Sequence, residues 1–126
     1  TRLRKETADD PIEQRRFLRE ARVTAMLQHP NTIPIYELSR DLKGHYYFTM
    51  KLVKGDTLRE IMNQLKQGDA ETREAYPLAV LIEVIVQICH ALDYAHNHGV
   101  VHRDVKPANI LIGPFGEVLV LDWGLA

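Results

Sequence analysis

A polar segment near the C-terminal end limits the folds open to this chain. It reads His102-Arg103-Asp104-Val105-Lys106-Pro107-Ala108-Asn109, and it lies between a long apolar stretch and two short apolar runs. A carboxylate, an ammonium group and an amide fall within six positions, from Asp104 to Asn109. Loops that are held between buried elements commonly carry reactive groups. The fold must therefore bury both neighbours of the segment and leave the segment itself open to a ligand.

The apolar stretch before this segment predicts a long helix from Pro77 to Gly99. Proline suits a helix start and glycine a helix end, and apolar residues recur between them at helical spacing. No apolar run reaches the roughly 18 to 20 residues that span a membrane, because Glu83 and Gln87 interrupt the best candidate. We expect a central helix with an apolar stripe formed by Leu78, Leu81, Ile82, Ile85, Ile88, Cys89, Leu92 and Ala95.

Two short strands are predicted after the segment, Ile110–Ile112 and Val118–Leu121. The residues between them, Gly113-Pro114-Phe115-Gly116-Glu117, have the glycine and proline of a hairpin turn. Asp122-Trp123-Gly124 follows at once, so a second carboxylate stands at the end of a strand. Such a carboxylate could hold a metal ion beside the polar segment.

The N-terminal half predicts one helix and an antiparallel pair of strands. The helix runs from Pro11 to Gln28, with Asp10 placed to cap it. The strands are Thr32–Leu38 and His45–Leu52, and the residues between them have turn chemistry.

A second helix is predicted to begin near Thr57 and to end at Gly68. Thr57 and Glu60 have the spacing of a capping box. The polar residues from Gly68 to Tyr76 are expected to form a loop. One face of this helix is apolar, with Leu58, Ile61, Met62 and Leu65.

Composition excludes several classes of protein. The 126 residues are enough for one domain at most. The 16 Lys and Arg residues nearly balance the 17 Asp and Glu residues, which argues against nucleic-acid binding by bulk charge and against a polybasic membrane surface. The single cysteine, Cys89, gives no disulfide framework, and the basic start lacks the apolar core of a signal peptide. We expect a cytoplasmic location, with membrane anchoring only through segments outside these residues.

Together these motifs resemble those of protein kinases. The segment from His102 to Asn109 is similar to the catalytic-loop signature of that family, and Asp122-Trp123-Gly124 is similar to its Asp-Phe-Gly triplet, with Trp for Phe. Seventeen positions, filled by the predicted hairpin, separate Asp104 from Asp122. The chain is identified as a member of the eukaryotic-like protein kinases of Ser/Thr type, and its triplet and hairpin turn resemble those of bacterial members.

The resemblance implies an α+β, protein-kinase-like fold of which the chain holds the central part. Residues 1–50 would belong to the small lobe, 51–55 to the hinge and 56–126 to the start of the large lobe. The helix from Pro11 is similar to the regulatory helix of the small lobe, with Glu20 at the position of its glutamate. Without the motifs, Glu20 would be read as a solvated helix carboxylate and Met50 as a core residue.

Roles for individual side chains follow from the resemblance. Asp104 would accept or orient the proton of the substrate hydroxyl. Lys106 would offset the charge of the transferring phosphoryl group and would favour Ser/Thr over Tyr substrates. Asn109 and Asp122 would hold Mg²⁺ that bridges the ATP phosphates, and Glu20 would complete the catalytic set. The nucleotide would be bound by Met50, Lys51, Val53 and Leu111, with the backbones of Lys51 and Val53 bonding adenine.

The implied function is a serine/threonine protein kinase that transfers the γ-phosphoryl group of ATP to hydroxyls of a protein substrate. An alternative is an inactive kinase-like module that binds or regulates a partner. A small-molecule kinase is a third possibility, against which the Lys106-Pro107 pair argues.

Parts of the family pattern do not occur in these residues. There is no Gly-x-Gly-x-x-Gly loop and no Val-Ala-x-Lys strand before the first helix, and Lys5 has the wrong context for that lysine. The activation segment would follow Ala126. We therefore expect the 126 residues alone to be inactive and to self-associate through the apolar surface of the long helix. Thr24 and Trp123 are milder departures from the family pattern. The family stacks apolar side chains at both positions, whereas Trp is larger than the usual Phe and Thr carries a hydroxyl.

Overall fold

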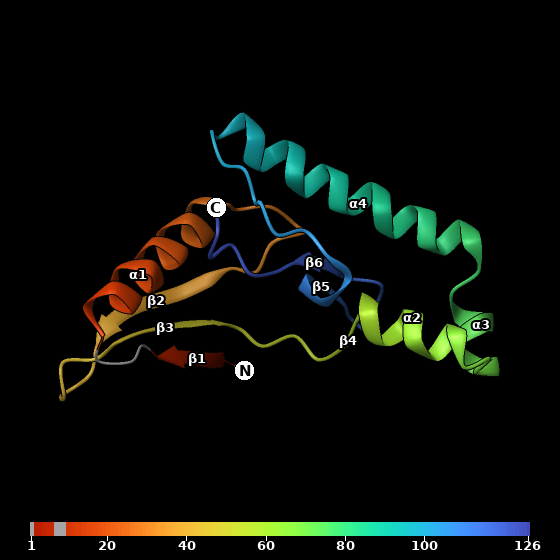
Figure 1. Cartoon of the computed structure of the whole chain (residues 1–126), viewed down its shortest axis with the longest axis horizontal. Helices are drawn as coiled ribbons and strands as arrows, with labels where there is room; N and C mark the ends of the chain where they lie inside the picture. Colours follow the sequence, from red (N-terminus) through yellow and green to blue (C-terminus); the bar gives the residue numbers. More distant parts are fainter. Residues whose placement is uncertain (1, 7–9) are drawn as a thin grey trace.

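The computed structural model describes residues 2–6 by their backbone and residues 10–126 with their side chains. Figure 1 shows α1 and β1–β3 on one side and α2–α4 with β4–β6 on the other, and residues 52–55 join the two groups without forming a helix or strand. This mixture agrees with the predicted α+β class. In chain order the elements are β1 Arg2–Glu6, α1 Pro11–Met26, β2 Ile35–Arg40, β3 Tyr46–Lys51, β4 Asp56–Thr57, α2 Leu58–Lys66, α3 Ala70–Ala75, α4 Leu78–Asn97, the 3₁₀ turn η1 Pro107–Asn109, β5 Ile110–Ile112 and β6 Val118–Val120.

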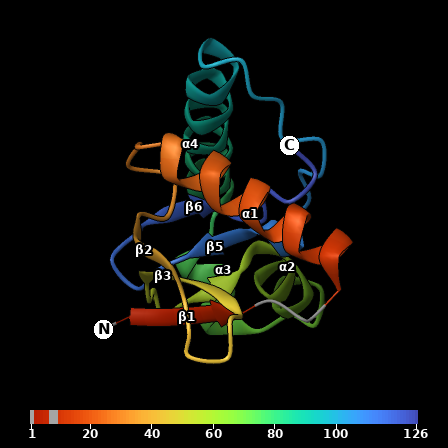
Figure 2. The same cartoon turned by 90° about the vertical axis from the view of Figure 1, so that its left-hand side faces the viewer.

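The first group is an antiparallel sheet with the strand order β1-β3-β2, and α1 lies across it (Figure 2). The ring of Phe17 on α1 lies 4.9 Å from the ring of Phe48 on β3, and Ala21 is buried beside them. The sequence predicts β2 and β3 but misses β1, because the charged residues of β1 form a strand only through their pairing with β3. The side chain of Lys5 lies outside the described residues.

The second group surrounds the small sheet β4-β5-β6. The hairpin of β5 and β6 is confirmed, and the two-residue strand β4 extends it by pairing Asp56 with Ile112. The predicted start of α2 is confirmed as well, since the Thr57 hydroxyl accepts a 3.2 Å hydrogen bond from the Glu60 N–H. The core between these elements includes Ile61, Ile110, Val118 and Val120.

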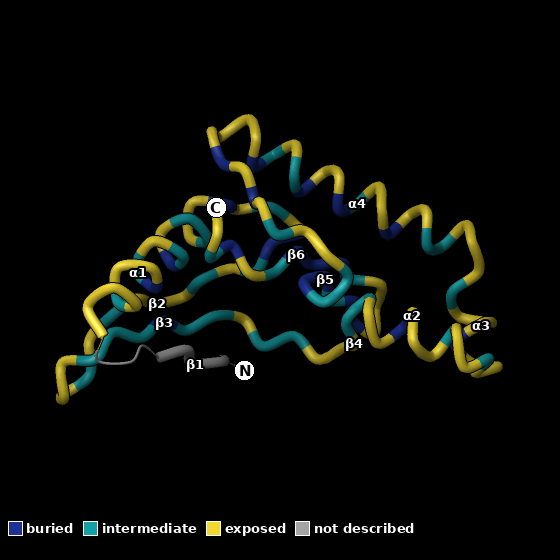
Figure 3. Tube along the Cα trace, in the orientation of Figure 1, coloured by how far each residue is buried: buried dark blue, intermediate teal, exposed yellow. Residues whose placement is uncertain are grey.

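The buried stripe of helix α4 overlaps the predicted one only in part, at Ile88 and Ala95. Apolar residues occur on all sides of this helix, so their spacing alone allows more than one buried stripe. The small side chains of Ala91 and Ala95 let the neighbouring strand β6 approach closely. Figure 3 shows the resulting division into a buried inner edge and an exposed outer edge. The buried stripe is Val84, Ile88, Ala91 and Ala95, whereas exposed residues include Leu78, Ile82, Ile85 and Cys89.

By length and composition, α4 also meets the requirement for a membrane-spanning helix. The expectation that no apolar stretch is long enough is therefore wrong. A central helix of a folded domain meets the same requirement. In the described residues α4 contacts β6 along one edge, and only 22% of its apolar window is buried.

The segment from Gly68 to Tyr76, predicted as a loop, contains the short helix α3. The Asp69 carboxylate caps this helix by accepting hydrogen bonds from the Thr72 hydroxyl and, at 3.0 Å, from the Thr72 N–H. These bonds, the hydroxyl first, hold the pKa of Asp69 below its ordinary value. The Thr72 hydroxyl also lies 3.1 Å from the Gln64 side-chain oxygen of α2. The prediction is wrong because these side-chain contacts stabilise a helix of polar composition.

Candidate active site

His102 anchors the polar segment to the end of the hairpin. The side chain is only 1% exposed. Its Nδ1 accepts a 3.0 Å hydrogen bond from the Asp104 N–H, and its Nε2 lies 2.8 Å from the Leu121 carbonyl oxygen. Since an N–H only donates and a carbonyl only accepts, both contacts are satisfied by a neutral imidazole with its proton on Nε2. The ring also packs 4.5 Å from the Trp123 ring, so one buried histidine holds the loop and the triplet together.

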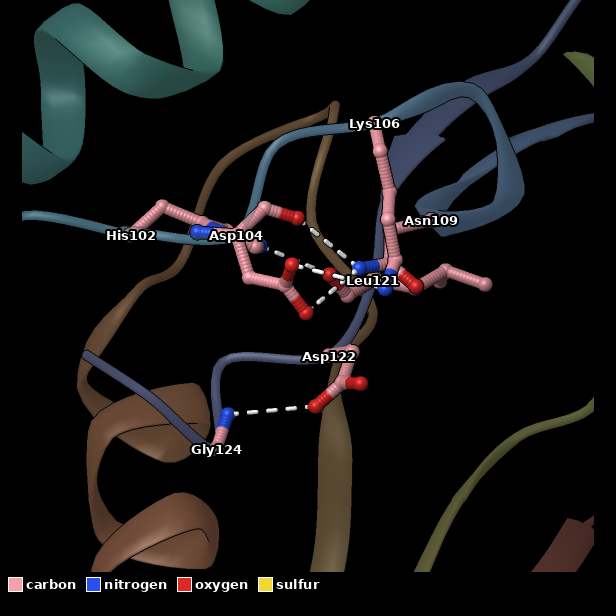
Figure 4. A network of polar contacts seen from close by, with 7 residues as sticks. All are labelled: His102, Asp104, Lys106, Asn109, Leu121, Asp122 and Gly124. Carbon is pink, nitrogen blue, oxygen red and sulfur yellow. Dashed lines mark hydrogen bonds and ion pairs between the residues drawn. The ribbon is translucent and has the colours of Figure 1, made fainter.

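Asp104 is held between a cation and an amide (Figure 4). The Lys106 ammonium lies 3.4 Å from Asp104 Oδ1. The Asn109 side-chain nitrogen donates to the Asp104 carbonyl at 2.9 Å and to Asp104 Oδ2 at 3.3 Å. The turn η1 places Asn109 in position, and Asn109 is buried. The three side chains, which the sequence places within six positions of one loop, therefore lie together in the structure.

Two residues of the site have backbone angles that are unfavourable for L-amino acids. Among the described residues other than glycine, only Arg103 and Asp122 have positive φ, at 71° and 57°. Such angles cost energy and persist where the surroundings enforce them, often at functional sites. The Arg103 side chain donates to the Leu125 carbonyl oxygen, which ties the polar segment to the residues after the triplet.

The Asp122-Trp123-Gly124 triplet follows the hairpin directly, and hydrogen bonds hold it in place. Trp123 is buried, and its indole N–H donates to the Val120 carbonyl at 3.2 Å. The Gly124 N–H donates to Asp122 Oδ1 at 3.3 Å. A Cβ at Gly124 would lie 3.1 Å from Asp122 Oδ1 and 3.6 Å from Glu20 Oε2. The Glu20 carboxylate of α1 thus reaches the triplet, more than a hundred positions away in sequence.

A cavity of about 380 Å³ lies beside these residues. Glu20, Asn109 and Asp122 line it, and so do all four residues expected to bind nucleotide, which are Met50, Lys51, Val53 and Leu111. Asp104 and Lys106 do not line the cavity, but the Asn109 amide links Asp104 to it. The structure therefore brings the expected residues together, while their roles in catalysis and binding stay predictions.

Sequence reasoning missed part of the cavity wall. The pattern of apolar residues in the predicted strands does not indicate which of those residues face a ligand. Thr24, noted only as a departure, lines the cavity, and its hydroxyl donates to the Glu20 carbonyl at 2.7 Å. That bond satisfies the hydroxyl inside its own helix. The other lining residues are Ile33, Phe48, Leu52, Val120, Leu121 and Trp123.

Within the part of the chain that the structure describes, no group of three or more His, Cys, Asp or Glu side chains is arranged to hold a metal ion. Glu20, Asn109 and Asp122 all bring side-chain oxygens to the cavity, and the family resemblance assigns the cation to Asn109 and Asp122. The Asn109 nitrogen already serves Asp104, so its amide oxygen is the atom left for a cation. One carboxylate and one amide oxygen fit Mg²⁺, which usually keeps water and substrate phosphates as its remaining ligands.

A two-group α+β fold with a cavity between the groups, and an Asp-Lys-Asn loop beside it, is the arrangement of a protein-kinase-like domain. The family model described as "Protein kinase domain" matches residues 2–126, so the chain belongs to the protein kinase domain family.

The relatives agree with this assignment. The chain is 45% identical over 129 residues to "Serine/threonine-protein kinase PknD" of Protochlamydia amoebophila and 38% identical over 128 residues to the protein of the same name of Chlamydia pneumoniae, with 99% of the chain covered in each case. It spans only 13% and 14% of those relatives' lengths. Among solved structures it resembles the PknI kinase domain of Mycobacterium tuberculosis, with a TM-score of 0.71 and 28% identity over 99% of this chain and 50% of that one.

Proposed function

We propose that the protein is a serine/threonine protein kinase that transfers the γ-phosphoryl group of ATP to hydroxyls of protein substrates. The observation that carries the proposal is the convergence of Asp104, Lys106 and Asn109 beside a cavity lined by Asp122. The names of the curated relatives, which are serine/threonine-protein kinases, support it.

In the proposed reaction, the hydroxyl oxygen of the substrate forms a bond to the γ-phosphorus of ATP. The bond from that phosphorus to the β–γ bridging oxygen breaks, and ADP leaves. The hydroxyl proton passes to the Asp104 carboxylate, whose position is fixed by the Asn109 amide and by Lys106. The Lys106 ammonium offsets the negative charge on the transferring group. Catalysis of this kind depends on positioning and electrostatics, since the transition state is mostly spread negative charge.

The cavity is the proposed nucleotide site. Its volume of about 380 Å³ falls within the range of about 300 to 1,000 Å³ that is common for small-molecule sites. Met50 and Leu111 supply apolar wall, and the backbones of Lys51 and Val53 would bond the adenine ring. In this arrangement the adenine ring would lie at the junction of the two groups, where residues 52–55 connect them.

Magnesium is the proposed cofactor, held by the Asn109 amide oxygen and the Asp122 carboxylate. When bound, it would neutralise charge on the ATP phosphates. The chain's own part is to aim these two oxygens. The hydrogen bonds of Asn109 to Asp104 and of Asp122 to the Gly124 N–H do this.

The test is an ATP-dependent phosphorylation assay on the protein at its natural length, with Ser, Thr and Tyr peptides as acceptors. Asp104→Asn keeps the shape of the side chain but removes the base, so we expect turnover to fall about a hundredfold to ten-thousandfold. Asp93→Asn, at an exposed position of α4, is the matched control and should keep its activity. Nucleotide binding without phosphoryl transfer in the unmodified protein would favour the inactive kinase-like module, and transfer only to Tyr would contradict the Ser/Thr assignment.

A further inference from the structure

A second, smaller cavity of about 240 Å³ lies between α2 and the polar segment. We name it the basic pocket. Three of its side chains are cations and none is acidic. Its walls include Arg59, Met62, Asn63 and Lys66 from α2 and Lys106 and Ala108 from the segment.

The positive charge of this pocket is only partly balanced. Lys106 has Asp104 at 3.4 Å. Arg59 and Lys66 are exposed, and within the described residues neither has an ion-pair partner. Two cations that line one concave surface without a carboxylate attract anions, because the walls exclude part of the screening solvent. The pocket therefore suits an anionic side chain of a bound partner.

The pocket also adjoins the proposed reaction centre, since Lys106 lines the pocket and contacts Asp104. Arg59 and Lys66 are seven positions apart on α2, which is about 10 Å along a helix axis. An extended peptide covers that length in about three residues. Lys106 lies 3.4 Å from Asp104 and also lines the pocket, and α2 contacts the turn η1 of the segment. A substrate whose hydroxyl lies at Asp104 therefore has a side chain a few residues away within reach of these cations.

We propose that the basic pocket selects substrates that carry an anionic side chain about two to four residues from the acceptor Ser or Thr. The proposal rests on the kinase function proposed above, because it assigns a substrate preference to the same site. The anion is a carboxylate or a phosphate, and the two differ in charge. Arg59 and Lys66 are the specificity-determining residues.

The experiment measures kcat/KM of the full-length protein for matched peptides. The peptides carry Ala, Glu, phosphoserine or Arg at each position within four residues of the acceptor. We expect the best Glu peptide to exceed its Ala counterpart by about threefold to tenfold, as for a pair of exposed charges. If the ratio of the phosphoserine peptide to its Ala counterpart exceeds that of the Glu peptide, phosphate is the preferred anion. If it does not exceed that of the Glu peptide, the preferred anion is a carboxylate. The preference should weaken as salt is raised from 0.05 to 0.5 M, the two limits of the assay.

Charge reversal separates recognition from a structural effect. Arg59→Glu and Lys66→Glu should each lower the ratio of Glu to Ala peptides and raise the ratio of Arg to Ala peptides. Lys43→Glu makes the same change of charge at the exposed tip between β2 and β3 and should leave both ratios unchanged. A melting curve of each variant checks that it is folded, and the salt dependence of the unmodified protein provides a measurement that needs no variant.

The outcomes are distinct. Equal kcat/KM for all peptides, or a Glu preference that survives both reversals, would overturn the basic pocket as a selector while leaving the kinase function intact. An absence of turnover on every peptide and on protein substrates would instead overturn the proposed function on which it rests.

Discussion

Asn31 joins the loop after α1 to the second group of elements, and its replacement tests how that junction is held. The side chain is buried, and its nitrogen donates to the Val118 carbonyl at 2.8 Å and to the Gln87 side-chain oxygen at 3.1 Å. The Asn31 carbonyl accepts from the Val120 N–H at 2.9 Å. Side chain and backbone together connect the loop to β6 and α4.

Two substitutions change this junction in different ways. Asn31→Ala removes both donated hydrogen bonds and leaves the buried Val118 carbonyl without this partner, so we expect a loss of about 2 to 3 kcal/mol in the free energy of unfolding. Asn31→Asp keeps the shape but turns a donor into a carboxylate that faces two oxygens about 3 Å away. An uncompensated buried charge of this kind costs about 3 to 5 kcal/mol at pH 7.

The two variants should also differ in pH dependence. Burial and the facing oxygens raise the pKa of an aspartate at position 31 above its unfolded value of about 3.9. A raised folded-state pKa gives stability that is complete below the unfolded value and lost as the pH rises. The Asp variant should therefore be least stable, relative to the unmodified protein, near pH 7 and should recover toward pH 4. The Ala variant should be less stable than the unmodified protein by the same amount at every pH.

The assay is urea unfolding followed by circular dichroism at pH 4.5, 5.5 and 7, the three conditions chosen for it. Asn97→Asp is the matched control, because the Asn97 side chain is exposed and, within the described residues, donates to the Asp93 carbonyl alone. It should change stability by less than about 1 kcal/mol. Equal stability of the Ala and Asp variants at pH 7, or a pH-independent Asp variant, would refute the reasoning from the two donated bonds.

Two further predictions concern the second group. A Cβ at Gly55 would lie 2.2 Å from the Ile112 backbone oxygen, so Gly55→Ala must shift backbone and should cost about 1 to 3 kcal/mol in urea unfolding. Gly116→Ala, with φ of 81° and open space around it, should cost only about 1 kcal/mol, and a reversed order would contradict the steric argument. Burial, with a smaller effect of Asp56, raises the pKa of Tyr76, so the stability that Tyr76 gives is complete below pH 10 and lost as the pH rises further. Asp56→Asn should lower that pKa in a phenolate absorbance titration, and an unchanged value would exclude the charge effect.

The candidate site could be predicted from the sequence largely because its residues are local. Asp104, Lys106 and Asn109 occupy one short loop, and a hairpin carries the chain directly from that loop to Asp122. Glu20 is different, since no local pattern links a carboxylate on α1 to the triplet. Its position came from the family resemblance, and the packing of α1 beside the cavity agrees with it.

The parts that escaped prediction depend on contacts between distant residues. The charged strand β1 is specified by its pairing with β3. Helix α3 is the exception, because its cap is local: the Asp69 carboxylate accepts from the Thr72 N–H and hydroxyl, an N-cap pattern that Asp favours, and the polar composition of the segment concealed it. The apolar pattern of α4 allowed several stripes, and only packing against β6 selects one. Local patterns therefore predicted which elements exist better than which faces they bury.

Leu121 explains how the two carboxylates of the site keep a fixed relation. Its N–H donates to the Asn109 carbonyl at 2.8 Å, and its carbonyl lies 2.8 Å from His102 Nε2. Both polar backbone groups of one residue are thus bound to the two ends of the polar segment. Asp122 is the next residue, and Asp104 is held by His102 and Asn109 through its own backbone. A displacement of the polar segment must therefore move Asp104 and Asp122 together, which preserves their spacing without any direct contact between them.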